Sequence, residues 1–153
     1  MQLAYLLKVE LIGSQTRLRM PDNAGSQHTR GTGEMNNSVL IVDDEENFLL
    51  LLDWILTKDG FRVKTASDAY QALNLLDEES FNLAIIDIQM SPIDGIGLLS
   101  ELRKRSPRTP VIMTTAYPER DTRRECMKNG AGALLVKPLD LEELKHLAHS
   151  LGD

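Results

Sequence analysis

The sequence has little cysteine and few aromatic residues, and each shortage argues against a class of protein. Cys126 is the only cysteine among 153 residues, so the chain can form no internal disulfide bond and no cysteine-based metal site. We therefore expect Cys126 to be an ordinary helix residue and the protein to occupy a reducing compartment, the cytoplasm. Aromatic residues make up 5% of the chain and hydrophobic residues 42%, which favours an aliphatic core over an aromatic-rich sandwich or barrel.

Long apolar runs are also missing. The strongest candidate, Leu3 to Ile12, is interrupted by Lys8 and Glu10, whereas a membrane span requires roughly 20 consecutive apolar residues. The same stretch is not typical of a secretory signal, because no basic region precedes it and no small-residue cleavage site follows it. We expect a soluble protein with no membrane association.

Basic residues are in deficit over most of the chain. The formal net charge is −6, and residues 38–153 carry 13 basic against 20 acidic side chains. Proteins that bind nucleic acid directly neutralise phosphates with dense basic patches, so this balance argues against a nucleic-acid partner. One small basic cluster, formed by Arg103, Lys104, Arg105 and Arg108, is expected to lie in solvent at the end of a helix.

Residues 13–37 differ from the rest of the chain in composition. They are rich in Gly, Ser, Thr, Asn and Gln and show almost no apolar periodicity, so they cannot bury enough apolar surface to offset the entropy lost on folding. We predict that residues 1–37 form a disordered N-terminal extension and that residues 38–153 form one folded domain. Met35 lies just before the first predicted strand, which leaves open the alternative that residues 1–34 come from an upstream, misassigned start.

From Val39 onward, short apolar runs alternate with longer amphipathic segments. The predicted strands are residues 39–42, 61–66, 81–87, 110–115 and 132–137, and the predicted helices are residues 45–60, 67–79, 96–105, 120–129 and 140–151. Strict alternation with short connections implies right-handed crossovers and a parallel sheet that helices cover on both faces. The predicted fold class is therefore α/β, with a doubly wound five-stranded parallel sheet.

Polar side chains stand at the carboxyl ends of four predicted strands. They are Asp43 and Asp44 after the first strand, Asp87 at the end of the third, Thr115 at the end of the fourth and Lys137 at the end of the fifth. Ligands of open α/β sheets bind at this edge. Taken singly, each residue has an ordinary explanation as a helix cap, an Asx-turn residue or a solvated lysine.

Taken together, three carboxylates at one edge indicate a bound cation, because without one they would repel each other and be partly protonated. Oxygen ligands exclude a typical zinc site, and few protein carboxylates with room for water and phosphate favour Mg²⁺ over Ca²⁺. The first strand leads into the acidic run DDEE rather than a glycine-rich phosphate loop. Phosphate would therefore have to arrive with the metal.

Four segments around these residues, LIVDDEE, AIIDIQMSPIDG, PVIMTTAY and GAGALLVKP, form a specific set. On these segments the chain from about Ser38 to Leu151 resembles the receiver domain of bacterial two-component response regulators. The resemblance implies a flavodoxin-like (βα)5 receiver fold. It also implies a phosphoacceptor that assists its own phosphorylation and dephosphorylation, and not a conventional enzyme.

The resemblance gives each residue of the set a role. Asp87 would accept a phosphoryl group from the phosphohistidine of a histidine kinase. Lys137 would stabilise negative charge on the phosphoryl oxygens, and Thr115 would donate its hydroxyl to the attached group. Mg²⁺ would be held by oxygens of Asp43, Asp44, Asp87 and the Gln89 backbone carbonyl. The Lys137-Pro138 bond resembles the family's cis peptide.

The chain departs from the family pattern at two places. Members commonly have Met-Pro shortly after the phosphorylated aspartate, whereas here Ser91 separates Met90 from Pro92. Leu134 stands where many members carry an aromatic switch residue, so the usual side-chain flip is not expected in its usual form. Gln89 occupies a position that varies in the family and tunes the lifetime of the phosphoryl group.

The resemblance implies two kinds of protein partner. A sensor histidine kinase or phosphotransfer protein would deliver the phosphoryl group, and a downstream protein would bind through residues 119–151. A homodimer is also possible. In the first helix we expect the core-facing stripe to consist of Phe48, Leu51, Leu52 and Ile55. This stripe leaves Leu49, Leu50 and Trp54 as a docking patch for the kinase, with a broader core-facing stripe as the alternative.

Two other functions remain as alternatives. A Mg²⁺-dependent phosphohydrolase of similar architecture would also use an aspartate nucleophile, but it normally carries Asp-x-Asp after the first strand. Here Asp43 and Asp44 are adjacent, and the chain has no cap insertion. A receiver-shaped interaction module that is never phosphorylated is a weaker explanation, because every site residue is present.

Overall fold

The structure is a computed structural model that describes residues 37–152. The predicted disordered extension, residues 1–37, lies outside the described residues except for Asn37. No helix in the described part of the chain combines the length and the apolar character that crossing a membrane requires.

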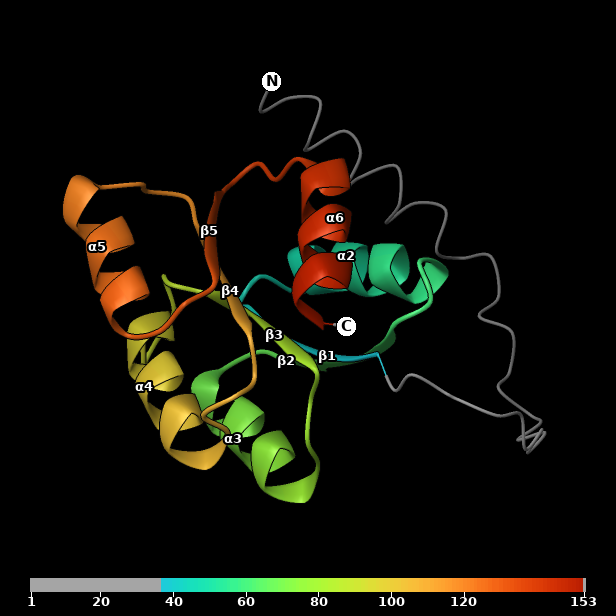
Figure 1. The fold of residues 1–153 in the computed structure, drawn as a ribbon, viewed down its shortest axis with the longest axis horizontal. Helices are drawn as coiled ribbons and strands as arrows, with labels where there is room; N and C mark the ends of the chain where they lie inside the picture. Colours follow the sequence, from blue (N-terminus) through green and yellow to red (C-terminus); the bar gives the residue numbers. More distant parts are fainter. Residues whose placement is uncertain (1–36, 153) are drawn as a thin grey trace. The chain divides into compact units, whose positions relative to one another are not determined.

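Five strands and five helices alternate along the described chain (Figure 1), as the sequence predicts. The strands are β1 (Ser38–Val42), β2 (Arg62–Ala66), β3 (Leu83–Asp87), β4 (Val111–Thr115) and β5 (Ala133–Val136). The helices are α2 (Glu46–Lys58), α3 (Ala69–Glu78), α4 (Gly95–Arg105), α5 (Arg120–Lys128) and α6 (Leu141–Gly152). The predicted elements are confirmed, and their ends differ by one or two residues.

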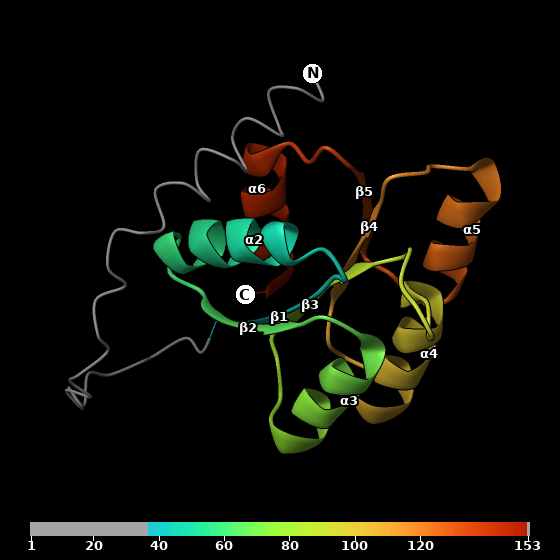
Figure 2. The same cartoon turned by 180° about the vertical axis from the view of Figure 1, so that it is seen from behind.

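All five strands are parallel and form one sheet in the order β2-β1-β3-β4-β5. Helices α2 and α6 cover one face of the sheet, and α3, α4 and α5 cover the other. Both of the opposite views show this arrangement (Figures 1 and 2). The direction of winding reverses between β1 and β3, because β2 lies on one side of β1 and the later strands lie on the other. Parallel strands place all their carboxyl ends at one edge, and the reversal opens a crevice there.

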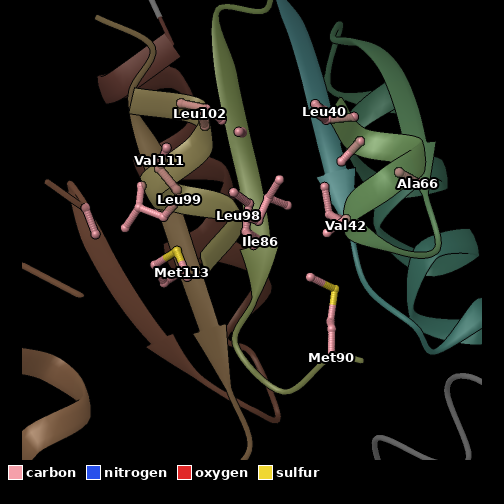
Figure 3. Close-up of a cluster of buried hydrophobic side chains, with 14 of the residues drawn as sticks. Leu40, Val42, Ala66, Ile86, Met90, Leu98, Leu99, Leu102, Val111 and Met113 are labelled. Atoms are coloured by element: carbon pink, nitrogen blue, oxygen red, sulfur yellow. The ribbon is translucent and has the colours of Figure 1, made fainter. Parts of the chain in front are cut away.

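The larger apolar cluster lies between the sheet and helices α3 and α4. Leu40 of β1, Ile86 of β3 and Met113 of β4 point into it, together with Leu98 and Leu102 of α4 (Figure 3). Strands β1, β3 and β4 are buried along their whole length, because helices cover both faces. This explains why these strands are continuous aliphatic runs rather than alternating polar and apolar residues.

Helix α2 buries a broader arc than the predicted stripe. Leu49 was expected outside the core-facing residues, but it is 7% exposed and belongs to the core. The prediction for Leu49 is therefore wrong, and the alternative of a broader core-facing stripe holds: Leu49 lies on the side of α2 next to β2, where it lines a hollow with Thr65 of β2 and Gln71 of α3, while α6 lies beside α2 on the same face of the sheet (Figures 1 and 2). Leu50 and Trp54 are exposed, at 47% and 48%, as expected.

Helix α2 ends at Lys58, two residues before the predicted end, and Gly60 follows. Gly60 has a φ of 95°, a left-handed conformation that glycine adopts without a steric penalty and that commonly terminates helices. The chain then reverses, and the Phe61 N–H donates to the Leu56 carbonyl at 3.0 Å.

Gly95, the first residue of α4, packs directly against the last residue of β3. Its N–H donates to the Ile88 carbonyl at 2.9 Å, and a Cβ atom at this position would overlap the backbone carbonyl of Asp87. Glycine is thus required here for close approach of two backbones, next to the candidate site.

We predict that Gly95→Ala lowers the free energy of unfolding by about 1–3 kcal/mol, because backbone atoms cannot move aside as a flexible side chain can. Gly152→Ala is the matched control, since a Cβ atom there meets only side-chain atoms, the nearest at 3.6 Å. Urea unfolding followed by circular dichroism measures both variants. Equal stability of the two would show that the backbone of Asp87 is not tightly held.

Candidate metal and phosphoryl site

Asp43 and Asp44 follow β1 at the carboxyl edge of the sheet, but their environments differ. Asp43 is fully buried, and its carboxylate accepts hydrogen bonds from the Lys137 Nζ at 2.7 Å and from the Glu45 N–H at 2.9 Å. Asp44 is exposed. One carboxylate therefore anchors the loop that leads into α2, and the other faces solvent at the mouth of the site.

Asp87 is the last residue of β3 and is 3% exposed. Its Oδ2 lies 3.6 Å from the Lys137 Nζ. Its Oδ1 is buried and has no hydrogen-bond partner among the described residues. A buried carboxylate oxygen without a partner is costly, which points to a ligand for that atom.

Lys137 follows β5 and reaches back across the sheet edge. The Lys137-Pro138 peptide bond is cis, as the resemblance implies, and the Lys137 side chain is 10% exposed. Its ammonium lies 4.2 Å from the centre of the Phe48 ring of α2, a cation–π contact that adds to its electrostatic stabilisation.

Burial dominates the titration of the site. It raises the pKa of Asp87 to about 6, and the neighbouring Asp43 carboxylate adds to the rise. Burial likewise raises the pKa of Asp43, although the hydrogen bond from Lys137 opposes the rise. Burial alone would lower the pKa of Lys137, but the hydrogen bond and the charge of Asp43 raise it above its ordinary value. The site thus has more negative charge than its one buried ammonium can neutralise.

The three aspartates are suited to a divalent cation. Asp43, Asp44 and Asp87 each offer a carboxylate oxygen, and these oxygens lie within 4.8 Å of one another. An oxygen-only set with three carboxylates suits Mg²⁺, which keeps several of its waters. The Asp87 oxygen that lacks a partner is a natural ligand atom for such an ion, so the residues present fit a magnesium site.

Thr115 ends β4 beside Asp87 and is fully buried. Its hydroxyl is bonded to the side chain of Gln89, whose Nε2 lies 2.9 Å away. The resemblance implies a role only for the backbone carbonyl of Gln89, so this side-chain contact was not predicted. The signal that could have revealed it is the strand order, because β3 and β4 are neighbours and Gln89 lies two residues beyond Asp87.

The family model described as the response regulator receiver domain matches residues 39–149. The chain belongs to this family. The match covers all five strands and all five helices, apart from Ser38 of β1 and residues 150–152 of α6.

Known receiver proteins share both the sequence and the fold of this chain. The Regulatory protein AtoC of Escherichia coli (strain K12) is 40% identical over 108 residues, which are 71% of this chain and 23% of that protein. The Transcriptional regulatory protein ZraR of Klebsiella oxytoca is 39% identical over 107 residues, 70% of this chain and 24% of that protein. The crystal structure of a response regulator receiver domain protein (CheY-like) from Methanospirillum hungatei JF-1 superposes with a TM-score of 0.71 at 31% identity, covering 75% of this chain and 93% of that one. This receiver chain spans about a quarter of the length of the two curated relatives.

We predict that Asp87→Asn stabilises the metal-free receiver domain. The pKa of Asp87 in the folded state, about 6, lies above its ordinary value of 3.8, so the folded state loses stability as the pH rises between these values. At a pH of about 7.5 the variant should be more stable by about 1–3 kcal/mol, since one pKa unit corresponds to about 1.4 kcal/mol.

Thermal and urea unfolding in EDTA over a range of pH measures this gain, which should shrink as the pH falls through about 6. The control is Asp121→Asn, which removes the same charge from an exposed position on α5 and should change stability by less than about 0.5 kcal/mol. A loss of stability in Asp87→Asn at neutral pH would show that the unpartnered carboxylate does not strain the fold.

Proposed function

We propose that this receiver domain acts in the cytoplasm as a phosphoacceptor, with Asp87 receiving a phosphoryl group from a sensor histidine kinase or a phosphotransfer protein. Mg²⁺ would be held by Asp43, Asp44, Asp87 and the backbone carbonyl of Gln89. The observation that carries this proposal is the gathering of three carboxylates around the buried Lys137 ammonium at one sheet edge. A nucleophilic carboxylate, a cation and charged neighbours at this spacing are what phosphoryl transfer requires.

In the reaction, a carboxylate oxygen of Asp87 forms a bond to phosphorus while the bond from phosphorus to the donor imidazole nitrogen breaks. The electron pair of that bond stays on the imidazole, which takes up a proton. The Lys137 ammonium neutralises charge that develops on the phosphoryl oxygens. A bound Mg²⁺ supplies further charge neutralisation and orients the group. The domain assists its own phosphorylation and, with water as the nucleophile, its own dephosphorylation.

The output surface proposed here comprises α5, β5 and α6, within residues 119–151. The phosphoryl group adds about −1.5 to −2 charges at the sheet edge, and Thr115, at the end of β4, connects this edge to α5. The outward side of α5 is basic, with Arg120, Arg123 and Arg124 exposed around the side chain of Met127. This surface suits a downstream protein with an acidic, partly apolar face.

We propose that the kinase docks on the exposed side of α2. Leu50 and Trp54 lie one helical turn apart and are about half exposed, and the Lys58 ammonium lies 4.1 Å from the centre of the Trp54 ring. An apolar pair of this kind, close to the mouth of the site, fits the apolar side of a helix in a partner.

Phosphorylation is tested by intact mass spectrometry after incubation with acetyl phosphate and Mg²⁺. We predict a gain of one phosphoryl group in the wild type, none in Asp87→Ala, and none in the wild type when EDTA removes the metal. Asp44→Ala should be phosphorylated at least about tenfold more slowly, because it lacks one anionic metal ligand. Phosphorylation of Asp87→Ala to the wild-type level would contradict the assignment of the acceptor.

Docking is tested by comparing two phosphodonors. Leu50→Glu and Trp54→Glu should slow transfer from a phosphorylated histidine kinase by about tenfold or more, since each buries a charge in an apolar contact. The same variants should react with acetyl phosphate at the wild-type rate, because α2 only docks the protein donor. Tyr70→Glu, which changes an exposed aromatic residue on α3, is the matched control. Unchanged transfer from the kinase in both α2 variants would exclude this docking surface.

A further inference from the structure

The side chain of Gln89 lies across the two hydrogen-bond donors at the end of β4. Its Oε1 accepts from the Thr115 hydroxyl at 3.2 Å and from the Ala116 N–H at 3.2 Å. Its Nε2 donates to the Thr115 Oγ1 at 2.9 Å. A single carboxamide therefore occupies a hydroxyl and a backbone amide that are adjacent in the chain.

The Gln89 carboxamide engages the Thr115 hydroxyl. A hydroxyl carries one hydrogen and two lone pairs. The Thr115 Oγ1 accepts from the Tyr117 N–H at 3.0 Å and lies 2.9 Å from the Gln89 Nε2 and 3.2 Å from the Gln89 Oε1. Because these two atoms belong to one carboxamide, the hydroxyl either accepts from the Nε2 or donates to the Oε1. In the second arrangement, a ligand on a neighbouring residue can receive the hydrogen only if Gln89 releases it.

Asp87, on the adjacent strand, has an acceptor atom that lacks a donor. Its Oδ1 is a buried acceptor without a partner among the described residues, and the residue pairs with Thr114, the neighbour of Thr115. An acceptor without a donor and a donor occupied elsewhere thus lie at the ends of two paired strands.

We propose that Gln89 is an internal competitor of the phosphoryl group. In the resting domain its carboxamide oxygen accepts from the Thr115 hydroxyl and the Ala116 N–H, which follow the strand residue that pairs with Asp87 and which a phosphoryl group on Asp87 would recruit. Phosphorylation must displace the carboxamide, so Gln89 weakens the coupling between Asp87 and Thr115 and raises the threshold for switching. Gln89 is on this view a positioning residue, and the inference rests on the proposed role of Asp87.

Beryllofluoride, a phosphoryl mimic, tests the competition without covalent chemistry. We expect Gln89→Met, which keeps the length of the side chain but makes no hydrogen bonds, to bind beryllofluoride in Mg²⁺ about tenfold more tightly than the wild type. The net loss of one hydrogen bond of ordinary strength accounts for a factor of this size. Amide NMR titration gives the affinity and a second readout, the Ala116 N–H resonance. This resonance should differ between wild type and variant without ligand and coincide when both are saturated.

Gln71→Met is the matched control. The Gln71 Oε1 accepts from a hydroxyl and a backbone amide in the same way, from the Ser67 Oγ at 3.1 Å and the Ser67 N–H at 3.0 Å, but at the start of α3. Its affinity for beryllofluoride should equal that of the wild type. Unchanged or weaker binding in Gln89→Met would overturn the competition, because a merely structural role for Gln89 predicts a loss. Failure of the wild type itself to bind would overturn the role of Asp87, and with it this inference.

Discussion

The Lys137 ammonium offsets the repulsion between the aspartates that gather at the carboxyl edge of the sheet. A parallel sheet brings the carboxyl ends of its strands to one side, and here three of the side chains at that side are aspartates. Lys137 bonds Asp43 at 2.7 Å and lies 3.6 Å from Asp87. Through this ammonium, Lys137 after β5 links Asp43 after β1 to Asp87 at the end of β3. Three carboxylates against one ammonium leave an excess of negative charge, which a divalent cation would neutralise.

Much of this arrangement follows from local properties of the sequence. Aliphatic runs with short connections predict buried parallel strands, and parallel strands predict that Asp43, Asp87 and Lys137 meet. Burial of α2 was predicted less well, because it depends on a distant element. Leu49 lies beside Thr65 of β2 and Gln71 of α3, and the periodicity of α2 alone does not reveal which elements lie next to this helix.

Side-chain contacts across strands could not be predicted from the chain either. The bond between Gln89 and Thr115 depends on which strands are neighbours and on the conformation of a long side chain. Leu134 is a related case. It is half-buried and packs against the larger apolar cluster, where an aromatic residue was the family expectation. With no hydroxyl of its own, Leu134 is positioned by packing alone, and hydrogen bonding at this edge is left to Gln89, Thr115 and their neighbours.

Helix α5 is attached to the domain by one buried side chain, that of Cys126. Helix α4 buries four residues, Gly95, Leu98, Leu99 and Leu102. Little apolar surface is exposed if α5 moves away from the sheet, so its local opening should cost far less free energy than opening the core, and its amides should exchange with solvent early. Among the helices of the described residues, α5 buries the fewest side chains, so we expect it to open most readily. On the proposed role of Asp87, a change at Thr115 would reach α5 a few residues later, so α5 could rearrange while the central strands keep their pairing.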